Sequence, residues 1–65
     1  MKQLRVLREA ANISTATLAK EMGVSSQAVG KWERGEAMPR AELLPKLADL
    51  LNCTLDALYG RDESA

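Results

Sequence analysis

The sequence is poor in the residues on which most metal sites, disulfides and active sites depend. It has no histidine and no phenylalanine, one tryptophan, one tyrosine and a single cysteine, Cys53. A lone cysteine has no partner within the chain, so nothing in the sequence indicates an oxidising compartment. Without histidine, a cysteine pair or a glycine-rich phosphate loop, the chain predicts no metal site, no cofactor and no enzyme activity.

Long apolar runs are missing as well. None approaches the roughly 18 residues that a membrane-spanning helix needs. Lys2 and Arg5 are not followed by the apolar core of a signal peptide. The sequence therefore predicts no membrane partner and a cytoplasmic protein.

The residues that are abundant favour helices. Of the 65 residues 46% are hydrophobic, and ten leucines and ten alanines make up most of that share. β-Branched aliphatic residues and aromatics are few, which disfavours a sheet. A chain of this length forms one domain near the lower size limit for folding without disulfides or metal. We expect an all-α domain over residues 1–60, with a frayed tail over residues 61–65.

Charge is distributed unevenly although the formal net charge is zero. Residues 1–40 hold seven bases and four acids, whereas residues 41–65 hold two bases and five acids. This asymmetry indicates that one end of the domain faces a polyanion and the other is turned away from it.

Apolar spacing predicts five helices, over residues 2–11, 15–22, 25–34, 42–51 and 55–59. Ser14 or Thr15 can cap the second helix, Ser25 the third and Thr54 the fifth. We place the start of the fourth near Glu42, because Pro45 is tolerated only in a first turn. On the fifth helix, we expect Leu55, Leu58 and Tyr59 to offer apolar surface for a dimer contact.

The second and third predicted helices meet the requirements of a helix-turn-helix. Ala19 is small where the two helices cross, and Gly23 can take the positive φ of the tight turn. Five apolar residues at the proper phases would face a shared core: Leu18, Met22, Val24, Val29 and Trp32. The set within 20 residues is a specific signal.

Several segments together resemble the XRE-type helix-turn-helix family, which includes the repressor and Cro proteins of lambdoid phages. They are LRVLR (4–8), IS (13–14), LAKEMGVS (18–25), VGKWERG (29–35), Pro39 and residues 47–58. The resemblance implies a compact five-helix lambda-repressor-like fold and sequence-specific binding of double-stranded DNA by a transcriptional regulator, most often a repressor. It also implies a homodimer on a partly palindromic operator, encoded by a prokaryote or phage.

The resemblance makes the helix from Ser25 to Arg34 the recognition helix, whose first residues meet base edges in the major groove. Ser26, Gln27 and Lys31 are its exposed candidates for base reading, since Gln suits adenine and Lys suits guanine. Candidates for the DNA backbone are Thr15, Ser25, Arg40, Lys20, Arg34 and Arg5.

Two positions depart from the family pattern. Thr15 stands where the family commonly has Gln, and Gly30 stands where it often has a side-chain donor. Gly30 can soften the recognition helix or allow a closer approach to DNA. The family pattern also places Arg8 and Glu33 face to face as a shielded ion pair.

The sequence leaves two alternatives open. A protein-interaction module of the antitoxin or anti-repressor type can keep the same fold without binding DNA. The chain can also be the DNA-binding part of a longer regulator.

Overall fold

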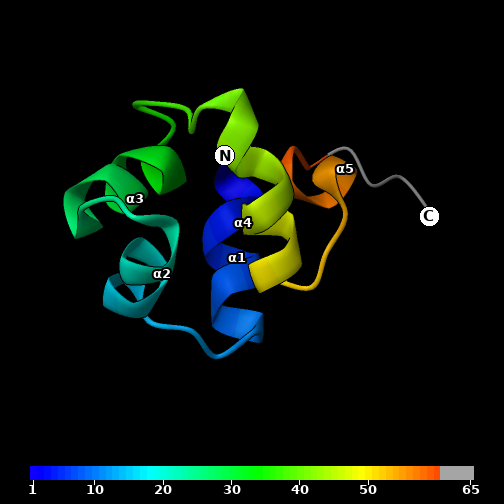
Figure 1. The fold of residues 1–65 in the computed structure, drawn as a ribbon. Helices are drawn as coiled ribbons and strands as arrows, with labels where there is room; N and C mark the ends of the chain where they lie inside the picture. Colours follow the sequence, from blue (N-terminus) through cyan, green and yellow to red (C-terminus); the bar gives the residue numbers. More distant parts are fainter. Residues whose placement is uncertain (61–65) are drawn as a thin grey trace.

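The computed structural model describes residues 1–60, and these residues form helices without any strand. The elements are α1 (Lys2–Ala10), α2 (Thr15–Met22), α3 (Ser26–Arg34), the 3-10 turn η1 (Ala41–Leu43), α4 (Leu44–Leu50) and α5 (Leu55–Leu58). In Figure 1, α2 and α3 lie side by side on one side of the molecule and α5 on the other, with α1 and α4 between them. The predicted five-helix all-α class is confirmed. The predicted tail, residues 61–65, lies outside the described part.

Three helices begin directly after hydroxyl residues that the sequence suggested as N-caps. Ser14 Oγ accepts a hydrogen bond from the Thr17 amide at 3.1 Å at the start of α2. Ser25 and Thr54 cap α3 and α5 in the same way. Each cap satisfies one of the amides that a first helical turn leaves without a partner.

The fourth helix differs from its prediction. A 3-10 turn, η1, comes first, and α4 begins at Leu44 instead of near Glu42. Pro45 therefore stands at the very start of α4, where its missing N–H breaks no helical hydrogen bond. The first helix is also shorter than predicted, ending at Ala10, and Asn12 then takes a φ of 61°.

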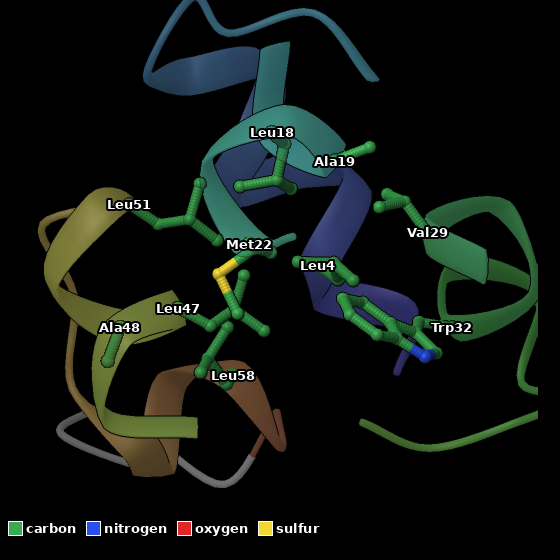
Figure 2. Packing of buried hydrophobic residues seen from close by; sticks show 10 residues of the cluster. All are labelled: Leu4, Leu18, Ala19, Met22, Val29, Trp32, Leu47, Ala48, Leu51 and Leu58. Atoms are coloured by element: carbon green, nitrogen blue, oxygen red, sulfur yellow. The ribbon is translucent and has the colours of Figure 1, made fainter. Parts of the chain in front are cut away.

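The core draws residues from all five α-helices. Figure 2 shows Trp32 of α3 beside Leu4 of α1, and Met22 of α2 near Leu47 and Leu58. All ten residues in that view are buried: Leu4, Leu18, Ala19, Met22, Val29, Trp32, Leu47, Ala48, Leu51 and Leu58. Because α3 is anchored through this core, its outward face is held in a fixed orientation.

The expectation for the surface of α5 is wrong in one residue. Leu58 is completely buried, so it stabilises the core and cannot contact a partner. Leu55 and Tyr59 keep 42% and 44% of their surface exposed. A four-residue helix presents one face to the core, and Leu58 points there while its neighbours do not.

The longest helices in residues 1–60 have nine residues. None of the described helices has both the length and the apolar character needed to cross a bilayer.

Candidate nucleic-acid interface

The turn between α2 and α3 spans residues 23–25 and determines how the two helices meet. Gly23 has a φ of 73°, in the left-handed region that favours glycine. The Val24 amide then donates to the Ala19 carbonyl at 3.0 Å, which closes the C-terminus of α2. Ala19 itself is 3% exposed and is small enough for α3 to pack closely against α2.

The third helix has a buried side and an open side. Val29 and Trp32 are buried in the core, whereas Ser26, Gln27 and Lys31 are exposed. Gln27 and Lys31 are four residues apart and so lie one above the other on the same face. The structure thus brings the three predicted base-reading residues together on the open side of α3.

Ser25 has a local role that leaves its hydroxyl hydrogen free for another partner. Its Oγ accepts a hydrogen bond from the Ala28 amide at 3.1 Å. A hydroxyl that accepts one bond can still donate a second, and the side chain is exposed at the N-terminus of α3. Anions are favoured at such helix ends by the free amides and the helix dipole.

The other backbone candidates are distributed around the helix-turn-helix. Thr15 is the first residue of α2 and is half-buried, and Lys20 is exposed near the end of the same helix. Arg40 lies at the end of the loop that follows α3, with its side chain 82% exposed.

Three arginines of the basic half carry acidic neighbours that sequence reasoning missed. Arg34 Nε lies 2.8 Å from Glu36 Oε2, and Arg5 Nε lies 3.1 Å from Glu9 Oε2. Arg40 Nη1 lies 3.7 Å from Oε2 of Glu42, which belongs to the 3-10 turn η1. The Arg5 pair has helical i, i+4 spacing and was readable from the sequence. The other two pairs join residues two apart at the end of α3 and at the start of η1, where the i, i+4 spacing rule does not apply.

The Arg34–Glu36 pair affects the ionisation of both groups. The hydrogen bond to Glu36 and its negative charge raise the pKa of Arg34, and the same hydrogen bond and the charge of Arg34 lower the pKa of Glu36. Both groups are therefore charged at neutral pH, and their pair has no net charge.

A fourth ion pair joins α1 to α3 and is shielded from water. Arg8 Nε donates to Glu33 Oε2 at 2.6 Å, and both side chains are only 12% exposed. Arg8 Nη1 also donates to the Ile13 carbonyl at 2.9 Å. A single guanidinium thereby connects α1, α3 and the segment that leads into α2.

One pocket lies elsewhere on the described surface. A cavity of about 310 Å³ lies between α1 and α5, lined by Gln3, Leu7, Ala57 and Gly60. None of these four residues is charged or nucleophilic. Residues 1–60 include no group of three or more His, Cys, Asp or Glu side chains placed to hold a metal ion. Apart from Arg5 on α1, the predicted base-reading and backbone residues lie on α2, on α3 and in the loops next to α3.

Comparison with known proteins agrees with this geometry. Residues 4–58 match the helix-turn-helix family HTH_3. The chain belongs to this family. The matched region starts in α1 and ends in α5, so the family pattern includes every described helix. The resemblance noted from the sequence is thus confirmed.

Similar members of the family include phage repressors. The chain is 43% identical over 54 residues to the cryptic phage CTXphi transcriptional repressor RstR of Vibrio cholerae, covering 83% of this chain and 48% of that protein. It is 38% identical over 63 residues to the repressor protein C2 of Salmonella phage P22, covering 97% and 29%. It is 32% identical over 57 residues to the transcriptional regulator YazB of Bacillus subtilis, covering 88% and 83%.

A solved structure has the same fold. It is the crystal structure of an HTH_3 family transcriptional regulator from Vibrio cholerae, with a TM-score of 0.72 and 35% sequence identity. The match covers 92% of this chain and 34% of that one. The chain spans about half the length, or less, of this regulator and of the two phage repressors.

Proposed function

We propose that this chain binds double-stranded DNA in a sequence-specific manner and that α3 reads base edges in the major groove. The observation that carries the proposal is that α3 has one buried face and one exposed polar face. Val29 and Trp32 fix its inner side, while Ser26, Gln27 and Lys31 stand together on the open side. A helix of this kind fits the major groove, which is wide enough to admit it.

Each of these three side chains has a chemistry suited to base edges. Gln27 can bond N6 and N7 of an adenine with its amide, and Lys31 can donate to O6 and N7 of a guanine. Ser26 can donate to or accept from several bases. Their positions in the first two turns of α3 match the part of a recognition helix that enters the groove.

A second group of residues would contact the sugar–phosphate backbone. Ser25 can donate its hydroxyl hydrogen to a phosphate next to the free amides of α3, and Thr15 can do so from the start of α2. Lys20 on α2 and Arg40 in the loop after α3 would add positive charge near the phosphates. Such contacts supply affinity and register without sequence preference.

We also propose that two copies bind one partly palindromic operator. One recognition helix covers only a few base pairs, and regulators of this type read half-sites about one helical turn apart. Leu55 on α5 and Tyr59 directly after it are exposed large side chains outside the helix-turn-helix, and we propose them as part of the dimer contact. Ultracentrifugation with a palindromic duplex should give two chains per duplex, and one chain per duplex at saturation would refute the dimer.

Repression is the regulatory outcome that we favour. Two of the similar proteins described above are named as repressors. A third relative, BcrR of Enterococcus faecalis, is named as a transcriptional activator and is 32% identical. A regulator of this kind would act inside the cell, where its operator is, and would need no enzyme activity.

A protein-interaction module on the same fold is the alternative. Selection from a pool of random duplexes, followed by affinity measurements at two salt concentrations, separates the two. A DNA reader should enrich one sequence and lose affinity steeply as salt rises. Failure to enrich any sequence, with no salt-dependent affinity, would favour the interaction module.

A further inference from the structure

Gly30 leaves a gap in the middle of the open side of α3, and the side chain of Arg34 fills it. A Cβ built on Gly30 would lie 3.1 Å from Arg34 Nη1 and 3.8 Å from Arg34 Cζ. The guanidinium therefore occupies the space into which a side chain at position 30 would extend. Long side chains on a helix lean toward its N-terminus, so this placement is the one that helical geometry favours.

Glu36, just beyond the end of α3, holds the guanidinium in this position. Arg34 Nε donates to Glu36 Oε2 at 2.8 Å, and Nη2 donates to Oε1 at 3.5 Å. The Glu36 carboxylate thus accepts hydrogen bonds from the edge of the guanidinium that Nε and Nη2 form. Nη1, which lies nearest Gly30, and the second N–H of Nη2 form the free edge of the guanidinium, and neither donates in the hydrogen bonds to Glu36.

The gap lies on the face that carries the proposed base-reading residues. Gln27, Lys31 and Arg34 are spaced i, i+4 and i+7, which places them on one stripe of α3. The Arg34 guanidinium lies beside Gly30, which precedes Arg34 by four residues, or about one helical turn. It is therefore displaced toward the N-terminal part of α3, the part that we propose enters the groove.

We propose that Arg34 is a further base-reading residue, which supplies the donor that Gly30 lacks, and that Glu36 is its positioning residue. The target is a guanine, because the free edge of a guanidinium matches O6 and N7 in a bidentate manner. This proposal rests on the proposed function of α3. It replaces the backbone contact that the sequence alone suggested for Arg34.

The charge of the pair favours a base edge over a phosphate. Arg34 and Glu36 together carry no net charge, so the pair has little long-range attraction for the DNA backbone. A phosphate at the guanidinium would also lie close to the Glu36 carboxylate and be repelled by it. A guanine edge is uncharged and gains most from a planar donor group that is already oriented.

Arg34→Lys is the direct test, because it keeps the charge and removes the planar fork. Binding-site selection from random duplexes is performed with the 65-residue chain and with this variant. We expect the variant to lose a guanine preference at one base pair by roughly 5- to 150-fold, the discrimination that a bidentate contact provides. Lys46→Arg is the matched control, since it exchanges the same two kinds of side chain at an exposed position of α4, outside the helix-turn-helix. It should leave every base preference unchanged.

Two further variants act on Arg34 through its neighbours. Glu36→Gln removes a negative charge near DNA, so affinity for scrambled duplexes should rise while the guanine preference falls. Gly30→Ala should raise thermal stability, because alanine favours helix over glycine, and should weaken the same preference by displacing the guanidinium. In an Arg34→Lys background, Gly30→Ala should change the preference at that base pair no further.

Two outcomes would overturn the proposal and are distinguishable. If Arg34→Lys leaves all preferences intact while Gln27→Ala and Lys31→Ala relax theirs, α3 reads DNA without Arg34. If none of the three variants changes any preference, the proposed function of α3 fails as well.

Discussion

Arg8 on α1 and Glu33 on α3 form an ion pair of 2.6 Å with both side chains largely shielded from water. The pair joins α3, which carries the proposed reading face, to α1 in the middle of the domain. Arg8 also bonds the Ile13 carbonyl, so the guanidinium has partners on two segments. Removing either partner leaves a charge in a site that offers it little water.

We predict that Glu33→Ala lowers the free energy of unfolding by roughly 3 kcal/mol, since it leaves Arg8 charged and without its carboxylate. Arg8→Ala combined with Glu33→Ala should cost less than the sum of the two single variants. Urea melts monitored by circular dichroism provide all three values.

The exposed pair of Arg5 and Glu9 is the control for this cycle. Its side chains are 69% and 55% exposed, and its coupling should stay below about 0.5 kcal/mol. Small and additive losses at Arg8 and Glu33 would contradict the interpretation of their pair as a shielded interaction.

The capping serines and threonines show how much of the fold the sequence predicts. A hydroxyl residue followed by an apolar helical pattern correctly indicated the starts of α2, α3 and α5. Such signals are local and therefore readable. The start of α4 was misplaced because η1 and an α-helical turn share the same apolar spacing over a few residues.

Tertiary relationships were predicted less well. The spacing of Leu55, Leu58 and Tyr59 does not reveal which of them enters the core, because a four-residue helix provides too short a pattern. The gap at Gly30 was visible as a departure from the family pattern, but its filling by Arg34 depends on a side-chain direction that Glu36 determines. The contact of Arg8 with Glu33 came from the family resemblance alone.

Ser25 should show two separable roles. Ser25→Ala removes the acceptor for the Ala28 amide and should cost about 1 kcal/mol of stability as well as DNA affinity. Ser25→Asp keeps a good helix cap but places a negative charge where we propose a phosphate. It should therefore retain stability and lose affinity at low salt.

Thr54→Ala is the matched control for the Ser25 variants, because Thr54 caps α5 in the same manner, accepting from the Ala57 amide at 3.0 Å. It should lower stability and leave the DNA affinity of the folded protein unchanged. Normal DNA affinity in Ser25→Asp would exclude a phosphate next to this serine. Thermal melts and fluorescence anisotropy provide the two readouts.

Burial raises the pKa of the Cys53 thiol. The thiol therefore ionises less readily in the folded chain than in the unfolded chain. At neutral pH it is uncharged in both states, and its burial contributes fully to the free energy of unfolding. That contribution is lost as the pH rises above the ordinary thiol pKa of about 8.5. We expect the wild type to lose more stability than Cys53→Ala between pH 8 and pH 10.

Alkylation gives an independent measurement of the same thiol. Iodoacetamide should modify Cys53 more slowly in the native chain than in urea at pH 8, because the thiolate is the reactive species. Equal rates in the two states, together with equal alkaline stability loss in Cys53→Ala, would show that burial does not affect this thiol.

Gln27 and Lys31 should determine sequence preference, whereas Arg40 should mainly supply affinity. Gln27 lies in the first turn of α3 and Lys31 one turn later on the same exposed face, so both can point into one groove. Arg40 follows α3 in a loop and is 82% exposed, with Glu42 Oε2 only loosely associated at 3.7 Å. Its reach and flexibility favour a phosphate over a base edge.

Gln27→Ala should therefore cost about 1–3 kcal/mol of binding free energy on the selected site and relax the preference for an adenine at one position. Lys31→Ala should do the same at a neighbouring guanine. Arg40→Ala should weaken binding to selected and scrambled duplexes alike and lower the salt slope by about one unit. Affinities of the three variants on both duplexes at two salt concentrations decide between these roles. If Gln27→Ala and Lys31→Ala leave the ratio of selected to scrambled affinity unchanged, these two residues do not read bases.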